Sequence, residues 1–155
     1  GVSRLAALAV ITSEDVLRIR ERLRLSNAAT RRLERIAAIL EACHGMRTIA
    51  DADIDELLFR QEDRAAVRDA LLLLHTDNGA AHDDLDWRRA HRRAAQAPVP
   101  DLPVSGDDLL RRGVPPGRSI GAALKTLQAR WIRAGFPRDP AVLARLVDEV
   151  VQDSG

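Results

Sequence analysis

Aromatic residues are scarce in this chain of 155 residues, which holds two Phe, two Trp and no Tyr. Proteins that bind single-stranded nucleic acid without sequence preference stack successive bases on aromatic side chains. So few rings argue against base recognition of that kind. Hydrophobic residues make up 46% of the chain and are mainly Ala, Leu and Val, a composition that favours helices over a β-sheet.

Cysteine is represented by Cys43 alone, which excludes an internal disulfide and fits the reducing cytoplasm. No catalytic motif surrounds this residue, so we interpret it as a structural thiol. The chain also lacks a signal-peptide pattern and the run of roughly 18 apolar residues that a membrane helix needs. We therefore expect a cytoplasmic protein without a membrane span, built as one domain or two small helical subdomains.

The net charge is only +1, but the charges are unevenly distributed along the chain. Residues 1–50 contain nine Arg against five acidic residues, and residues 51–87 contain three Arg against eleven. Residues 88–155 contain eleven Arg and one Lys against seven acidic residues. Two basic blocks flanking an acidic one suit a polyanion that contacts some faces of the protein; local charge pairing within helices is the simpler alternative.

Apolar residues recur at helical spacing along most of the sequence, with no convincing strand pattern and no internal repeat. Residues suited to cap a helix stand before the predicted helices: Thr12 or Ser13, Ser26, Asp51 or Asp53, Asp63, Asp83 or Asp84, Ser105 and Asp139. A short helix over residues 3–10 brings the expected total to about eight or nine. The sequence therefore predicts an all-α fold.

Prolines interrupt the helical pattern most strongly from Pro98 to Pro103, a stretch of six residues with three prolines. Proline lacks a backbone donor and disfavours helix in the residue before it, so this segment is predicted to be an extended connector. We assign residues 1–97 to a helical body, residues 98–104 to the connector and residues 105–155 to a small helical tail.

The start of the predicted tail combines helix caps with turn residues. Ser105 suits the N-cap of a short helix, and Gly113 suits a left-handed residue that ends it. Pro115-Pro116-Gly117 then leads into a second helix with an apolar stripe of Ile120, Leu124, Leu127 and Trp131. We expect a helix-hairpin-helix-like turn that offers backbone amides to an anion beside Arg118, with an ordinary helix–helix corner as the alternative.

Arginine pairs at i,i+4 spacing mark two further helices. Arg18 and Arg22 share one flank of the helix that is expected to follow Ser13. Two more pairs are expected on one exposed flank of a later helix: Arg88, Arg89, Arg92 and Arg93. Like charges at this spacing repel by about 0.2–0.5 kcal/mol. A bound phosphate would relieve that repulsion, and solvated helix flanks are the alternative.

Two segments resemble a known protein family. The first, Ser-Gly-Asp-Asp-Leu-Leu…Gly-Val-Pro-Pro-Gly-Arg-Ser-Ile-Gly…Trp-Ile…Gly-Phe-Pro, runs from Ser105 to Pro137. It is similar to the C-terminal region of bacterial CCA tRNA nucleotidyltransferases and related poly(A) polymerases. The second, Arg-Leu-Arg-Leu-Ser-Asn-Ala from Arg22 to Ala28, resembles a segment of the helical body in the same family. The two matches stand in family order and, with the helices between them, cover most of the chain.

The resemblance implies an all-helical body and tail that bind tRNA or structured RNA, next to a catalytic head that lies outside this chain. Mg²⁺ and CTP or ATP are expected in that head, and no cofactor or metal is expected in this fragment. The expected partners are the RNA and the head. Charge geometry and the turn motif together select the candidate RNA-binding residues: Arg18, Arg22, Arg88, Arg89, Arg92, Arg93, Gly117, Arg118 and Lys125.

Other functions have weaker support in the sequence. The catalytic carboxylates of the family follow a Gly-Ser pair on a strand, whereas Asp51–Asp55 and Asp84–Asp86 precede helical patterns, where capping explains them. His82-Asp83, with His44 and Asp148 formally available, leaves a His-Asp-type phosphohydrolase as a weak alternative. A helical protein-interaction or structural module that does not bind RNA is the other alternative.

Overall fold

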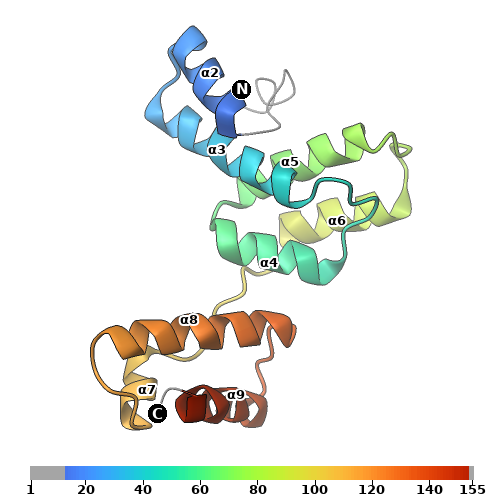
Figure 1. The fold of residues 1–155 in the computed structure, drawn as a ribbon. Coiled ribbons are helices and arrows are strands. Elements are labelled where there is room, and N and C mark those ends of the chain that lie inside the picture. Colours follow the sequence, from blue (N-terminus) through green and yellow to red (C-terminus); the bar gives the residue numbers. More distant parts are fainter. Residues whose placement is uncertain (1–12, 154–155) are drawn as a thin grey trace. The chain divides into compact units, whose positions relative to one another are not determined.

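The computed structural model describes residues 13–153, and this part of the chain is all-α, as the sequence predicts (Figure 1). The described helices are α2 (Ser13–Leu23), α3 (Asn27–Ala42), α4 (Asp51–Gln61), α5 (Arg64–Asp77), α6 (Leu85–Gln96), α7 (Gly106–Arg111), α8 (Arg118–Arg133) and α9 (Pro140–Asp153). None of these helices is long and apolar enough to cross a membrane. The helix expected over residues 3–10 and the alternative cap at Thr12 lie outside the described residues.

The chain divides into two compact units, Gly1–Val99 and Pro100–Gly155. Unit 1 contains α2 to α6, and unit 2 contains α7 to α9. The residues between α6 and α7, from 97 to 105, form no helix, because three prolines in this segment remove backbone donors and restrict the residues before them.

Side-chain caps fix the beginnings of three helices in unit 1. Ser26, Asp63 and Asp84 each accept a hydrogen bond from the backbone N–H three residues further on, at 3.3, 3.0 and 3.1 Å. Each of these bonds satisfies a donor that the first helical turn leaves unpaired. The three caps predicted at these positions are confirmed.

Unit 1 is organised around α5, which packs against α3, α4 and α6, while α2 packs on α3 and α4 packs on α6. Val16 of α2 is fully buried in this core, but Leu23 is half exposed. The buried apolar side of α2 therefore ends before its last residue. Leu23 is the last residue of α2, and the chain turns away at Arg24, whose φ of 49° is left-handed.

Unit 2 begins with a helix that is capped at both ends. The Ser105 hydroxyl accepts from the Asp108 N–H at 3.3 Å, and the Asp108 carboxylate accepts from the Ser105 N–H at 2.7 Å, a reciprocal capping box. At the other end Gly113 adopts a φ of 92°, and the Val114 N–H reaches the Leu109 carbonyl at 3.1 Å. This is a Schellman ending, with Leu109 and Val114 buried together.

Helix α8 is the long element of unit 2 and packs against both α7 and α9. Its C-terminus is a second Schellman ending, in which the Phe136 N–H donates to the Trp131 carbonyl at 3.1 Å. The rings of Trp131 and Phe136 meet edge to face, with centroids 4.9 Å apart. The indole N–H of Trp131 donates to the Pro137 carbonyl at 2.8 Å. These contacts fix the direction in which the chain leaves α8 toward α9. The likeness of the α7–α8 turn to a helix-hairpin-helix motif stays a prediction.

Candidate nucleic-acid interface

The four arginines of α6 point in two directions. Arg93 donates from Nε to Asp55 at 2.8 Å and from Nη1 to Asp51 at 3.1 Å. The hydrogen bond to Asp55 raises the pKa of Arg93, and the charges of Asp55 and Asp51 act in the same direction. Arg89 also contacts Asp51, at 3.3 Å, and lies 3.5 Å from Asp86. These two arginines thus bind the acidic face of α4.

Arg88 and Arg92 lie on the other side of α6. Both are exposed and have no hydrogen-bond or ion-pair partner among residues 13–153. Arg88, Arg89 and Arg92 are thus exposed as expected, whereas Arg93 is partly buried against α4. Residues 88 and 92 turn outward, whereas residues 89 and 93, one step further round the helix, face α4.

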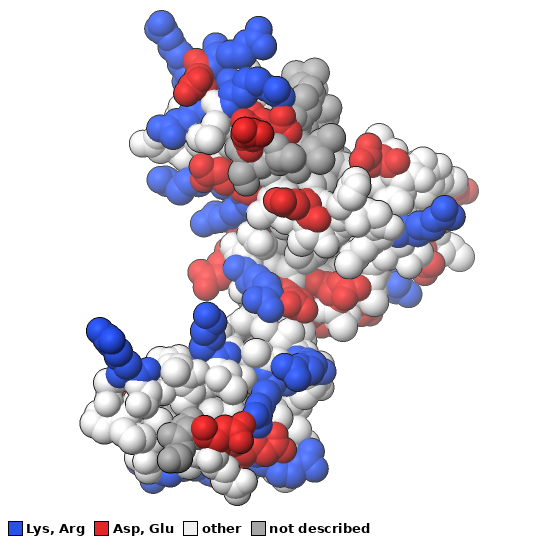
Figure 2. Space-filling view, in the orientation of Figure 1, with Lys and Arg blue, Asp and Glu red and all other residues white. Residues whose placement is uncertain are grey.

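The second candidate pair in unit 1 lies on α2. Arg18 forms an i,i+3 ion pair with Asp15 and remains largely exposed. Arg22 is exposed and has no protein partner within the described part of the chain. Figure 2 shows arginine side chains gathered over α2 and the beginning of α3, with acidic groups among them. This region is basic but not free of negative charge.

Helix α8 carries basic residues and no acidic one. Arg130 turns toward α9, where it forms ion pairs with Glu149 and Asp153. The other basic side chains, Arg118, Lys125 and Arg133, are exposed and have no protein partner among the described residues. They recur about every two turns and define the α8 face, a line of roughly 22 Å along the helix. Figure 2 shows blue side chains along the part of unit 2 where α8 runs.

Small residues separate the cations of the α8 face. Gly121, Ala122 and Ala129 lie on the same exposed side of the helix as Lys125, opposite the buried Leu127 and Trp131. A surface of this kind lets an extended polyanion approach the helix backbone closely. Arg133 was not among the residues selected from the sequence, although the absence of any acid from residues 118–133 is a signal that was available there.

The N-terminus of α8 is open. Gly117 has a φ of 96° and a ψ of −136° and supplies no side-chain cap, so the first amides of α8 have no capping side chain. Both Gly117 and Arg118 are exposed. Arg118 therefore stands in the first turn of α8, where no side chain caps the amides and the helix dipole is positive.

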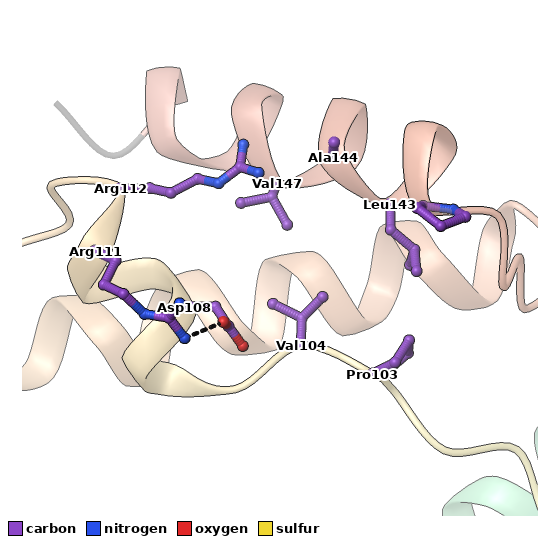
Figure 3. A pocket seen from close by; sticks show the side chains of 9 residues that line it. Pro103, Val104, Asp108, Arg111, Arg112, Leu143, Ala144 and Val147 are labelled. Carbon is purple, nitrogen blue, oxygen red and sulfur yellow. Dashed lines mark hydrogen bonds and ion pairs between the residues drawn. The ribbon is translucent and has the colours of Figure 1, made fainter.

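A hollow of about 310 Å³ in unit 2 lies between the connector, α7 and α9 (Figure 3). Its wall is apolar, with Val104, Leu143 and Val147. The two arginines at its rim are each held by a carboxylate: Arg111 by Asp108 at 2.6 Å, and Arg112 by Asp148. Their charges are neutralised locally, which makes this hollow a poorer anion site than the α8 face.

The acidic residues at the beginning of α4, which could suggest a metal site, instead form hydrogen bonds and ion pairs within the protein. The Asp53 carboxylate accepts from the Ala50 N–H at 3.0 Å at the start of α4, while Asp51 and Asp55 bind Arg93. The N-cap of α4 is Ala50, and Asp53 closes the first turn from the third helical position, not from before the helix as predicted. The ion pairs of its two neighbours are not predicted from the sequence. Within residues 13–153, no three His, Cys, Asp or Glu side chains group closely enough to hold a metal ion.

Comparisons of this chain with protein-family models, with curated proteins and with solved structures find no match.

Proposed function

We propose that this chain is the RNA-binding body and tail of a bacterial CCA-adding tRNA nucleotidyltransferase or a related poly(A) polymerase. The segments 22–28 and 105–137, which resemble that family in the family's order, support the proposal. In this role the chain holds tRNA or another structured RNA by its backbone. Mg²⁺, CTP or ATP and the transfer reaction belong to a catalytic head that this chain does not contain.

The observation that carries RNA binding is the acid-free α8 face, whose three cations have no partner among the residues that the structure describes. A charged side chain already paired with a carboxylate must give up that partner to bind a phosphate, whereas Arg118, Lys125 and Arg133 need not. Contacts to phosphates supply most of the affinity of proteins for folded nucleic acids and do not require aromatic rings. The α8 face therefore suits recognition of RNA by its shape and backbone.

Unit 1 is proposed to contribute a second set of phosphate contacts. Arg88, Arg92 and Arg22 are exposed and unpaired within the described residues, and Arg18 is exposed beside Asp15. Arg89 and Arg93 remain candidates from the sequence, but binding of RNA would have to compete with Asp51 and Asp55. We therefore expect Arg88 and Arg92 to contribute more to RNA affinity than Arg89 and Arg93.

The test is a titration of the chain with unmodified tRNA at low and at moderate salt, followed by mobility shift. Electrostatic binding predicts that affinity falls steeply as salt rises, with a slope of about 0.7–0.9 log units for each phosphate contact. Absence of binding at low salt would reject the proposal. Self-association without any response to tRNA would instead favour a helical protein-interaction module.

A further inference from the structure

A second hollow, of about 400 Å³, lies within unit 1 where α3, α5 and α6 meet. It is lined by Arg32 from α3, by Arg68 and Asp69 from α5, and by His91 from α6, with Ala65 and Leu72 as apolar neighbours. Three of the four polar lining residues are cationic or can become so. This site shares no residue with the α8 face.

Arg32 is held in place but is not fully satisfied. Its Nη2 donates to Asp69 Oδ2 at 2.6 Å, which fixes the guanidinium at the edge of the hollow. Its Nε is buried and has no hydrogen-bond partner within the described part of the chain. A buried, unpaired N–H of a charged group is costly and calls for an acceptor. An oxyanion in the hollow would supply one once the guanidinium turns, because Nε itself has almost no solvent-exposed surface.

Arg68 and His91 add positive charge to the same space. Arg68 is exposed and has no ion-pair partner among residues 13–153, so the single carboxylate of the hollow, Asp69, faces two arginines. The Nε2 atom of His91 forms a hydrogen bond with His75. The Nδ1 atom of His91 can therefore take up a proton when an anion lies nearby. Burial lowers the pKa of His91, and the charges of His75 and Arg68 lower it further.

We infer that this hollow is a binding site for a phosphate group, held by Arg32 and Arg68 with His91 at its side. The phosphate comes either from the backbone of an RNA or from a free phosphate compound. Both sources present the same oxygens to a guanidinium, and arginine is well suited to bind them. The inference does not rest on RNA binding by the α8 face.

The test uses NMR on the whole chain at constant ionic strength, with inorganic phosphate added first at one pH and then across a series of pH values. Saturable shifts of the Arg32 Nε–H and the His91 ring are expected, and the pKa of His91 should rise, because an anion stabilises the protonated imidazole. Arg68→Gln should weaken phosphate binding by at least about tenfold, the loss expected for a charge-assisted hydrogen bond. Arg68 has no partner within residues 13–153, so this variant should fold normally.

Arg47→Gln is the matched control. Arg47 lies on the same unit, is exposed, has no partner in the described part of the chain and does not line the hollow. It should bind phosphate like the unchanged chain. The proposal is overturned if phosphate leaves Arg32 Nε–H and His91 unperturbed, or if both variants bind it equally well.

A titration with tRNA separates the two sources. If the phosphate belongs to RNA, Arg68→Gln weakens tRNA binding and Arg47→Gln has a smaller effect. If the two variants bind tRNA equally while only Arg68→Gln loses inorganic phosphate, the ligand is a free phosphate compound. Arg118 and Lys125 are unchanged in these variants. A negative result for phosphate binding in the hollow therefore does not count against RNA binding by the α8 face.

Discussion

The Nδ1 atom of His75 lies 3.2 Å from the Nε2 atom of His91. The other ring nitrogen of His75 is 3.0 Å from the carbonyl oxygen of Ala81, which can only accept a hydrogen bond. His75 therefore carries its proton on Nε2, and its Nδ1 accepts the Nε2–H of His91. The His75 ring also stacks on Trp87, with centroids 5.0 Å apart. This pair ties α5 to α6.

Acidification should weaken this arrangement. Burial, His75 and Arg68 lower the pKa of His91, and Arg32 and Asp69 are the other charged groups that line the hollow beside it. The unfolded chain, with an ordinary histidine pKa of about 6.5, takes up the proton more readily than the folded one. The stability that the neutral ring contributes is present above that pH and is lost as the pH falls below it.

The measurement is urea unfolding in phosphate-free buffer at about pH 7.5 and pH 5.5, a range that spans the ordinary histidine pKa. The free energy of unfolding should be lower at the acidic value, and His91→Gln should reduce the difference. His82→Gln, which changes an exposed histidine, should leave it unchanged. An equally steep loss of stability in His91→Gln and in the unchanged chain would contradict the account.

The two sides of α6 should separate stability from binding. Arg93→Ala removes the contacts with Asp55 and Asp51 and should destabilise unit 1 by about 1–2 kcal/mol, since Arg93 is partly exposed. Arg92→Ala should change the stability by less than about 0.5 kcal/mol, yet weaken tRNA binding more than Arg93→Ala does. Urea unfolding followed by the indole NMR signal of Trp87 and tRNA titrations would measure both effects. Equal effects of the two variants on both properties would refute this division.

Gly117 and Gly121 offer a test of the turn before α8. A Cβ at either position meets no atom within 4 Å, so neither substitution causes a clash. Gly117→Ala should nevertheless cost about 1–3 kcal/mol, because its φ of 96° is strained for any residue with a side chain. Gly121→Ala lies within the helix and should stabilise unit 2 by about 0.5–1 kcal/mol. Unfolding followed by the Trp131 indole signal gives both free energies. An unchanged free energy of unfolding in Gly117→Ala would contradict the backbone strain at this position.

Much of the fold was predictable because its determinants are local. Ser26, Asp63, Asp84 and Ser105 cap helices from positions that the sequence identifies, since a cap needs only a suitable side chain before a helical pattern. Gly113 ends α7 for an equally local reason, a left-handed conformation that glycine adopts freely.

The candidate site was predictable only in part, because it depends on contacts between distant segments. Arg88, Arg89, Arg92 and Arg93 are equivalent as a charge pattern, and only the packing of α6 on α4 shows which two face Asp51 and Asp55. The hollow beside His91 depends likewise on Arg32, which lies 59 positions earlier in the chain. The spacing of residues along the sequence does not predict contacts between residues so far apart.

The most direct test of the account is the salt dependence of tRNA binding in two double variants of unit 2. Arg118→Ala/Lys125→Ala removes two cations from the α8 face, and Arg138→Ala/Arg145→Ala removes two other exposed arginines that have no partner among the described residues. The first variant should bind tRNA more weakly and lower the salt slope by about 0.7–0.9 for each lost phosphate contact, whereas the second should stay close to the unchanged chain. Equal affinity and equal slopes for the two variants would contradict RNA binding by the α8 face.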